Sequence, residues 1–283
     1  MDSLAAYGYS FVPGIVRKPH VSGYFYPSEQ DALREKIAWA FTHWNGPGYI
    51  PQVKAIDQKK GIIAPHAGYD YSAPVAAHSF GSLANSGKYD YYVVIGPNHT
   101  GLGSPISIGD QDYSTPLGRA KVNLEAVNDL QDDVVTVDNM AHVQEHSVEV
   151  EIPFLQYIYG DVEIVPIVMM DQSVEAAQHL ASRLKKLKGN FTIVASSDLN
   201  HYLTLSRLKK LDGHFSQAVL NRDIRTIYRY EYSGEISVCG FGPIVTLLST
   251  YEGKIDLLKL SNSIAMMESE TGVGYASFAV EMI

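Results

Sequence analysis

Histidine and aspartate side chains occur directly after three apolar stretches of the chain. The stretch GIIAP is followed by His66, VVIGPN by His99, and TIVASS by Asp198 and His201. Two imidazoles and one anion form an economical ligand set for a divalent metal that keeps open coordination positions. The same residue types also transfer protons in general acid–base catalysis. This repeated placement therefore indicates a metal site, provided that the three stretches bring the side chains together.

The single cysteine, Cys239, is a further candidate ligand. It lies in SVCGFGPIVTLL, just before a predicted helix that contains Pro243. A helix N-terminus and its backbone amides stabilise a thiolate, which is a metal ligand or a nucleophile. Structural roles remain open for each candidate. A lone cysteine is often a small buried apolar residue, Asp198 can cap a turn, and a histidine after a strand is often a hydrogen-bonded loop residue.

A competing motif lies at His142-Val-Gln-Glu145-His146, which reads as H-x-x-E-H, the inverted form of a zinc-peptidase motif. That chemistry needs both histidines on one face of a helix, with the glutamate as the base. Helical spacing of apolar residues begins only after His146, and the run Val148–Ile152 also fits a strand. A zinc peptidase is therefore a remote alternative.

The candidate residues need a sheet to position them. Short runs rich in valine and isoleucine predict strands that are covered on both faces. These are Gly61–Pro65, Tyr91–Gly96, Val162–Met169, Phe191–Ala195 and Gly274–Met282. Ligands of open parallel sheets bind beyond the carboxyl ends of the strands. His66, His99 and Asp198 follow three of these strands, so a parallel sheet would place them at one edge.

Helical patterns alternate with these strands. We predict helices at Ser28–Phe41 with Ser28 as its cap, Pro74–Leu83, Leu124–Asp132, Val174–Lys186 and Pro243–Tyr251. Alternation of this kind favours a central, mostly parallel sheet with helices on both faces. We find no linker that divides the chain, so we expect residues 1–283 to form one three-layer α/β/α domain.

Composition excludes several classes of protein. The chain has 283 residues, 46% of them hydrophobic, which is enough for a large core. Its net charge is −9 and it has no basic stripe, which argues against a nucleic-acid partner. One cysteine cannot form an internal disulfide, which fits a reducing compartment. No apolar run could span a membrane, and residues 1–19 lack the features of a signal peptide. We therefore expect a cytoplasmic protein.

Longer motifs resemble those of a known family. The segments VSGYFYPSEQDAL, IIAPHAGYDYSAPVAAHSF, VVIGPNHTG, STPLG, EHSVEVEIPFLQ, IVPIVM, SSDLNHY and CGFGPI follow one another along the chain in the order typical of the Memo family. Memo proteins are similar to class III extradiol dioxygenases, which are non-haem iron enzymes with a three-layer α/β fold. The resemblance implies metal ligands at His66, His99 and Cys239. It also implies an acid/base role for His201, and places for Asp198 and His146 in the same pocket.

The resemblance leaves more than one function open. The first is a metal-dependent oxidoreductase that acts on a small substrate, with Fe(II) as the expected metal. A thiolate ligand also suits Cu(I) or Zn. The second is a peptide-binding signalling adaptor that retains the pocket without turnover. The third is redox or metal buffering through Cys239, because a thiolate can be oxidised. The sequence does not determine the substrate or the oligomeric state.

Overall fold

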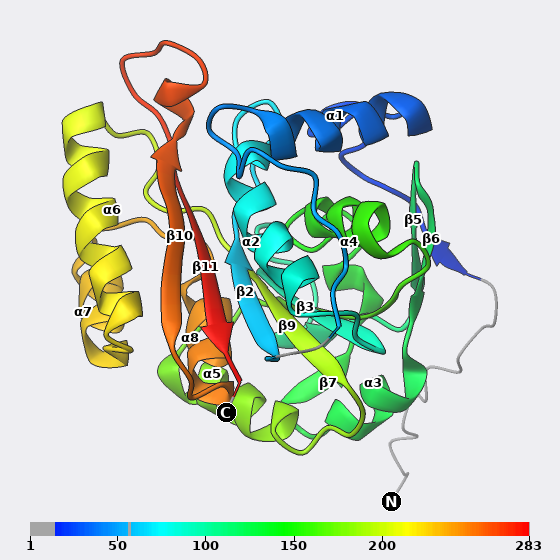
Figure 1. The fold of residues 1–283 in the computed structure, drawn as a ribbon. Coiled ribbons are helices and arrows are strands. Elements are labelled where there is room, and N and C mark those ends of the chain that lie inside the picture. The colour runs from blue at the N-terminus through cyan, green and yellow to red at the C-terminus, as the bar shows by residue number, and fades with distance from the viewer. Residues whose placement is uncertain (1–14, 56–57, 283) are drawn as a thin grey trace, which may run out of the picture.

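A twisted central sheet organises the molecule (Figure 1). The structure is a computed structural model that describes residues 15–55 and 58–282. The segment assessed for a signal peptide therefore lies largely outside the described residues. The strand order of the sheet is β1-β5-β6-β8-β3-β9-β2-β11-β10, and β4 and β7 pair beside β8.

The strands have the following bounds. They are β1 Val16–Arg17, β2 Lys60–Ala64, β3 Tyr91–Pro97, β4 Ile106–Ile108, β5 Asp112–Thr115, β6 Gly118–Val122, β7 Val135–Val137, β8 Glu163–Met169, β9 Phe191–Ser196, β10 Ile255–Asn262 and β11 Gly274–Glu281. The five strands β6, β8, β3, β9 and β2 run parallel to one another. Strand β11 extends this sheet antiparallel to β2, and β10 pairs with β11 antiparallel at the edge.

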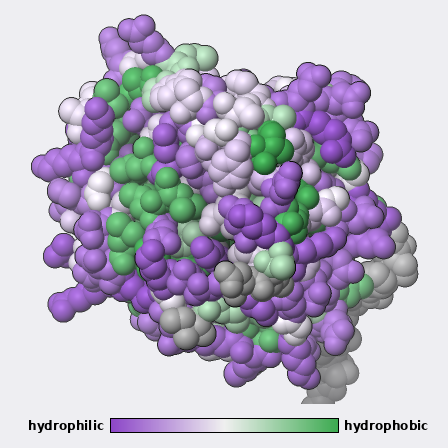
Figure 2. Space-filling model, viewed as in Figure 1, coloured by the Kyte–Doolittle hydropathy of each residue, from purple (hydrophilic) through white to green (hydrophobic). Residues whose placement is uncertain are grey.

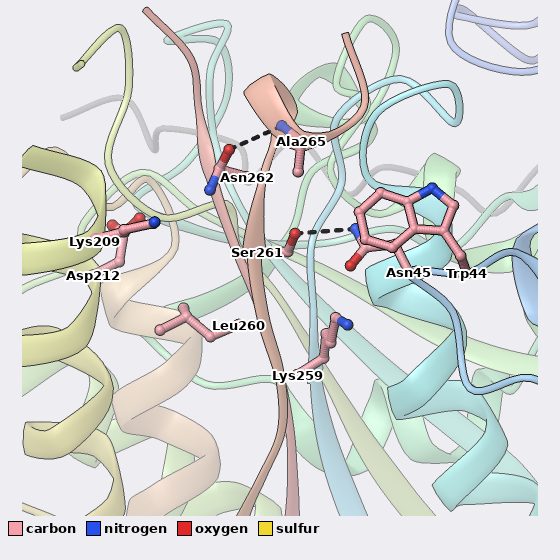
Figure 3. A pocket seen from close by; sticks show the side chains of 9 residues that line it. All are labelled: Trp44, Asn45, Lys209, Asp212, Lys259, Leu260, Ser261, Asn262 and Ala265. Carbon is pink, nitrogen blue, oxygen red and sulfur yellow. Dashed lines mark hydrogen bonds between the residues drawn. The ribbon is translucent and has the colours of Figure 1, made fainter. Parts of the chain in front are cut away.

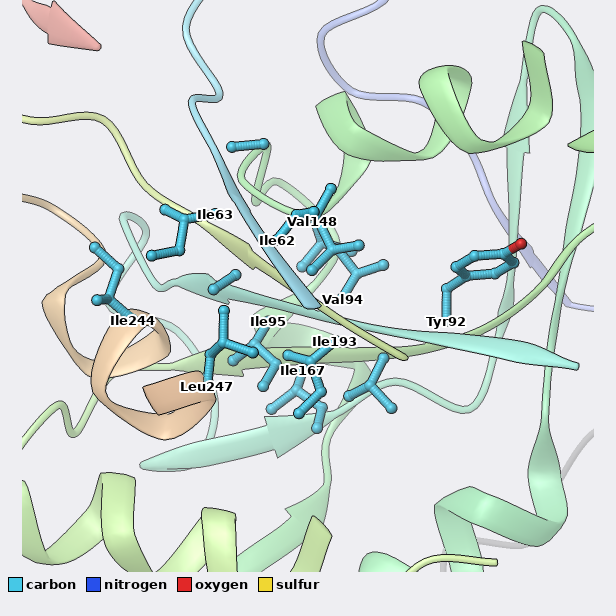
Figure 4. Close-up of a cluster of buried hydrophobic side chains, with 14 of the residues drawn as sticks. Ile62, Ile63, Tyr92, Val94, Ile95, Val148, Ile167, Ile193, Ile244 and Leu247 are labelled. Atoms are coloured by element: carbon cyan, nitrogen blue, oxygen red, sulfur yellow. The ribbon is translucent and has the colours of Figure 1, made fainter. Parts of the chain in front are cut away.

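The central strands are apolar because both of their faces are covered. Every residue of β3 and β9 is buried. Figure 4 shows Val94 and Ile95 of β3 close to Ile193 of β9, with Ile244 and Leu247 of a neighbouring helix packed beside them. Strands that are buried on both faces lose the alternation of polar and apolar residues. This burial explains why continuous apolar runs in the sequence correctly predicted these strands.

Helices form a layer on each face of the sheet (Figure 1). One layer contains α1, α2 and α4, and α2 packs on β2 and β11. In the other layer α8 packs on β3 and β9 and α5 packs on α8, and α6 and α7 continue this layer beside β10. Their bounds are α1 Gln30–Thr42, α2 Ala73–Asn85, α3 Leu124–Leu130, α4 Ile152–Tyr159, α5 Val174–Leu184, α6 Leu205–Leu220, α7 Ile224–Ser233 and α8 Phe241–Thr250. The expected mixed α/β fold with a large central sheet flanked by helices is confirmed.

The sequence patterns found the buried strands but missed other elements. All five predicted strands and all five predicted helices are present, although α1 is capped by Glu29 rather than Ser28 and makes no side-chain capping bond. Strands β4 to β7 are short and β10 is half-exposed, so they lack a continuous apolar run. Helices α6 and α7 were not predicted. The segment at Val148–Ile152, left open between strand and helix, is a 3-10 turn that leads into α4.

The surface is mostly hydrophilic. In the view of Figure 2, hydrophobic residues gather over the half-exposed strand β10, and polar side chains cover most of the remaining face. Among the described residues, no helix has both the length and the apolar character needed to cross a membrane.

Candidate metal centre

Three neighbouring parallel strands deliver the predicted residues to one edge of the sheet. Strand β9 lies between β3 and β2, and the three run in the same direction. His66 follows β2, His99 follows β3, and Asp198 follows β9, so all three leave the sheet at the carboxyl ends of the strands. The loop before α8 adds Cys239 at the same edge.

His66, His99 and Cys239 form a compact group of potential ligands. One donor atom from each residue lies within 4.8 Å of the other two. Nε2 of His66 is 3.2 Å from Sγ of Cys239, and the ring centroids of His66 and His99 are 5.2 Å apart. His66 is buried, Cys239 is half-buried, and His99 is partly open to solvent. Solvent can therefore reach the cluster at His99, whereas His66 is packed inside the protein.

Glu145 orients His99. Its carboxylate lies 2.9 Å from Nδ1 of His99 and accepts the backbone N–H groups of His99, His146 and Ser147. Burial opposes ionisation of this carboxyl, but the hydrogen bond and charge of His99, the charge of His146 and the backbone donors hold the pKa of Glu145 at about 2. A carboxylate on Nδ1 directs the other ring nitrogen of a histidine toward a metal. Nε2 of His99 is therefore the free donor.

Ser196 orients His66 in a comparable way. Its hydroxyl oxygen is 2.7 Å from Nδ1 of His66, and it also contacts the buried carboxyl of Glu151 at 2.8 Å. Burial lowers the pKa of His66 well below its usual value, and the nearby rings of His146, His99 and His201 add to this effect. His66 is consequently neutral, which is the state in which imidazole binds a metal.

Asp198 ties the loops together rather than joining the ligand group. Its Oδ1 accepts the backbone N–H of His66 at 2.9 Å and that of Ala67 at 3.3 Å. Its own backbone N–H donates to Sγ of Cys239 at 3.3 Å. Burial raises the pKa of Asp198 to about 6 despite the charge of His201 and these donors. Asp198 thus fixes the positions of two ligand-bearing loops.

His146 contacts the rings of His66 and His99, and a backbone carbonyl holds the ring of His201. Nδ1 of His201 lies 2.7 Å from the carbonyl of Ser237, which can only accept, so this nitrogen carries the proton and Nε2 is left free. The ring of His146 stacks on that of His99 at 4.5 Å and meets the edge of Phe25. Burial and the charge of His99 lower the pKa of His146 to about 4.

The state of Cys239 differs from the expectation of a thiolate stabilised by the helix. Burial and the charge of Asp198 raise the pKa of the Cys239 thiol well above its usual value, although neighbouring hydrogen-bond donors oppose this. Desolvation therefore outweighs the helix N-terminus. A metal ion held by Cys239 would reverse this balance, because a coordinating thiol loses its proton to the positive charge of the ion.

His142 lies outside the cluster, so the arrangement does not match a zinc peptidase. Its Nδ1 accepts from Tyr113 at 2.8 Å and its Nε2 faces the carbonyl of Ser107 at 3.2 Å. It follows a 3-10 turn, and Glu145 and His146 lie in irregular backbone. His146 instead groups with His99 and Glu145. The two histidines of the H-x-x-E-H motif therefore do not share a helix face.

Comparisons with known proteins show which family the chain belongs to. The family model described as Memo-like protein matches residues 17–279. The chain belongs to the Memo-like family. A MEMO1 family protein of Thermotoga petrophila is 42% identical over 87% of this chain and 92% of its own length. One from Methanobrevibacter smithii is 39% identical over 93% and 99% of the two chains, respectively.

The fold is also shared with a solved structure of low sequence similarity. An uncharacterized protein from Escherichia coli K12 superposes with a TM-score of 0.54 at 13% identity. It covers 78% of this Memo-like chain and 99% of its own length. At this identity the likeness concerns the fold alone.

Several residues of this Memo-like site were not predicted from the sequence. Ser196 contacts Nδ1 of His66, and Glu151 contacts Ser196. The carbonyl of Ser237 contacts Nδ1 of His201. Glu149 forms a buried ion pair with Arg17 at 2.7 Å, and Arg17 also donates to the backbone carbonyl of Glu145. The available signal was the run EHSVEVEIPF, which holds three glutamates, two of which (Glu149 and Glu151) alternate with apolar residues. Alternation of this kind resembles a half-exposed strand, yet all three carboxyl groups are buried.

A separate hollow lies over β10. It encloses about 350 Å³ between α6 and the segment that follows α1 (Figure 3). Its lining is Trp44, Asn45, Lys209, Asp212, Lys259, Leu260, Ser261, Asn262 and Ala265. None of these residues belongs to the metal group. The hollow adjoins the site only indirectly, because Asp212 accepts from the side chain of Asn200, which in turn accepts from the backbone of Ser237.

Proposed function

We propose that this Memo-like chain holds one mononuclear metal ion on His66, His99 and Cys239 and acts as a metal-dependent oxidoreductase on a small substrate. Fe(II) is the proposed ion, with Cu(I) or Zn(II) as alternatives. The observation that carries the proposal is the convergence of three potential donor atoms within 4.8 Å of one another, from segments 33 and 140 residues apart in the chain.

The side chains fit a transition-metal ion by their chemistry. Two neutral imidazoles and one sulfur suit Fe(II), Cu(I) or Zn(II), whereas Mg²⁺ and Ca²⁺ prefer oxygen ligands. Each imidazole is held by its Nδ1 atom, which is the usual support of a metal-binding histidine. A metal ion bound here would supply Lewis acidity and, for iron or copper, redox chemistry.

The other residues have roles that follow from their contacts. Nε2 of His201 is free to accept or donate a proton, because Nδ1 is held by Ser237. Asp198 keeps the loops of His66 and Cys239 together through backbone hydrogen bonds. His146 stacks on the ring of His99 and restricts its orientation. The exposed face of His99 leaves room for a small molecule to approach.

Metal content tests the centre itself. Protein purified without oxygen and loaded with Fe(II) is expected to retain one ion per chain. His66→Ala and Cys239→Ser should lose it, because each removes one of three ligands. His179→Ala is a matched control, since His179 lies on α5 and pairs with Asp132 at 2.8 Å. Equal metal content in wild type and His66→Ala would exclude the proposed ligand set.

Oxygen consumption tests the oxidoreductase reaction. Loaded wild-type protein is expected to take up O2 in the presence of small phenolic compounds, and His201→Gln should lower the rate without loss of metal. Metal binding without turnover, combined with affinity for peptides, would instead favour the adaptor function. Metal release on oxidation of Cys239, without substrate chemistry, would favour metal buffering.

A further inference from the structure

The hydroxyl of Ser196 makes three short contacts that determine where its proton lies. Its Oγ is 2.7 Å from Nδ1 of His66, 2.7 Å from the backbone carbonyl of Ser147 and 2.8 Å from Oε1 of Glu151. A serine hydroxyl donates one hydrogen bond and accepts two. The carbonyl of Ser147 can only accept, so the single proton of Ser196 points to it. The two remaining neighbours must then both be donors.

This count assigns a proton to each of the two neighbours. Nδ1 of His66 carries one and donates it to Ser196. Oε1 of Glu151 carries the other, so Glu151 is a carboxylic acid rather than a carboxylate. An ionised Glu151 would compete with the carbonyl of Ser147 for the same proton and leave one short oxygen–oxygen contact without a hydrogen. Only the neutral acid satisfies all three contacts.

The surroundings of Glu151 agree with a neutral acid. The residue is fully buried, and its second oxygen, Oε2, has no hydrogen-bond partner among the described residues. Burial raises the pKa of Glu151 well above its usual value, and the nearby charge of Asp198 adds to this, whereas the hydrogen bond to Ser196 opposes it. A buried carboxylate with one unpaired oxygen and no cation beside it is far more costly than a neutral carboxyl group.

We propose that Ser196 and Glu151 are positioning residues of the metal centre, with Glu151 acting as a neutral hydrogen-bond donor that holds His66 in the tautomer protonated at Nδ1. This tautomer leaves the lone pair on Nε2, the atom that faces Sγ of Cys239 at 3.2 Å. His66 is thereby prepared as a ligand before any metal arrives. The consequence for metal affinity rests on the proposed function, whereas the proton positions do not.

Two measurements on metal-free protein test the proton positions. The infrared difference between wild type and Glu151→Gln, in protein carrying ¹³C-labelled glutamate, is expected to show the C=O stretch of a carboxylic acid at neutral pH. The ¹⁵N shifts of His66 are expected to show a protonated Nδ1 and an unprotonated Nε2. Carboxylate bands in the first measurement, or a proton on Nε2 in the second, would overturn the proposal.

Zinc affinity, measured by competition with a chromogenic chelator, tests the consequence for the centre. Ser196→Ala should weaken Zn²⁺ binding by roughly 10–100-fold, the range typical of lost support for a metal-binding histidine. Glu151→Leu should also weaken it, whereas Glu151→Gln should restore most of the affinity because its amide N–H donates to Ser196. Ser86→Ala is a matched control, since Ser86 is also buried and bonds the carbonyl of Leu83, but lies at the end of α2.

The outcomes separate this proposal from the proposed function. Unchanged zinc affinity in Ser196→Ala, or an equal loss in Ser86→Ala, would overturn the positioning role. Failure of Glu151→Gln to bind more tightly than Glu151→Leu would do the same. If Ser196→Ala does not fold, the comparison of Glu151→Gln with Glu151→Leu and the infrared and ¹⁵N spectra test the positioning role instead. Absence of zinc binding in wild type would remove the metal centre, and the metal-free spectra would still decide the proton positions.

Discussion

At the scale of single residues, the site is defined by how each ring is held. Nδ1 of His66, His99 and His201 contacts Ser196, Glu145 and the carbonyl of Ser237, respectively. Each of these partners leaves Nε2 free. The orientation of the rings, and not only their presence, therefore makes a metal centre chemically reasonable.

Replacing Glu145 by glutamine tests this point. The amide keeps the shape of the side chain but loses the negative charge of the carboxylate. That carboxylate accepts hydrogen bonds from Nδ1 of His99 and from three backbone N–H groups. We expect Zn²⁺ affinity to fall by roughly 10–100-fold. The measurement is a chelator competition on purified protein. Glu252→Gln serves as the control, because Glu252 pairs with Lys185 at the surface. Wild-type affinity in Glu145→Gln would show that His99 needs no such support.

At the scale of elements, the segment from Glu145 to Glu151 supports the whole centre. It crosses the carboxyl ends of β3 and β9, where Ser147 donates to the carbonyl of Pro97 and accepts from Ser196. Close approach to β3 depends on Gly96, because a Cβ there would overlap Oγ of Ser147 and lie 2.7 Å from its Cβ. The absence of a side chain at Gly96 thus lets Ser147, and with it the glutamate-bearing segment, pack directly on β3.

Gly96→Ala should disturb this contact. We expect it to lower the free energy of unfolding by about 1–3 kcal/mol, the usual cost of an extra methyl group in a filled interior. Zinc affinity should fall as well, since the segment that holds both ligand histidines must move. Urea unfolding and the chelator assay provide the two measurements.

Gly213→Ala is the matched control for this substitution. Gly213 lies inside α6, and a Cβ there meets no atom within 4 Å. Its replacement should raise stability by about 0.5–1 kcal/mol, because alanine loses less backbone entropy in a helix. Equal stability of the two alanine variants would contradict the packing argument.

At the scale of the whole molecule, the beginning of the described chain secures this segment. Arg17 of β1 donates to the carbonyls of His142 and Glu145 at 2.6 and 2.7 Å and pairs with Glu149 at 2.7 Å. Both charged groups are buried, so the loss of either one would leave the other unpaired at a cost of about 3–5 kcal/mol. The candidate metal site is therefore coupled to global stability.

Acid should unfold the metal-free protein partly through His142. Burial and the charge of Arg17 lower the pKa of His142 to about 3, whereas an unfolded chain titrates near 6.5. The unfolded state therefore binds more protons as the pH falls through this window, and stability falls with it. Asp198 and Asp212 act in the opposite direction, because burial raises the pKa of each to about 6.

The contribution of His142 is isolated by comparison with His142→Gln. The variant should be less stable than wild type at neutral pH, because buried hydrogen bonds to Tyr113 and Ser107 are altered. Its stability should decline less steeply between about pH 6.5 and 4. Urea unfolding midpoints at several pH values give both slopes. A variant that loses stability as steeply as wild type would show that His142 does not take up the proton.

The sequence by itself determined the strands that carry the site and the edge at which it lies. Continuous apolar runs are local features, and they marked β2, β3, β9 and β8 before any tertiary contact was known. Because parallel strands end at one edge, the residues after them had to approach one another. That rule was sufficient to group His66, His99, Asp198 and His201, and the position of Cys239 before a predicted helix made it a further candidate.

Tertiary structure alone decided how each of these side chains is held. Ser196 meets His66 across 130 residues of chain and Glu151 meets Ser196 across 45, and no local pattern encodes such contacts. Desolvation likewise depends on everything packed around a group, so the Cys239 thiol keeps its proton in the metal-free protein although it precedes a helix. His142, three residues before Glu145, faces Tyr113 and Ser107 instead of the metal group. Side-chain direction and proton position follow from packing, which distant segments build together.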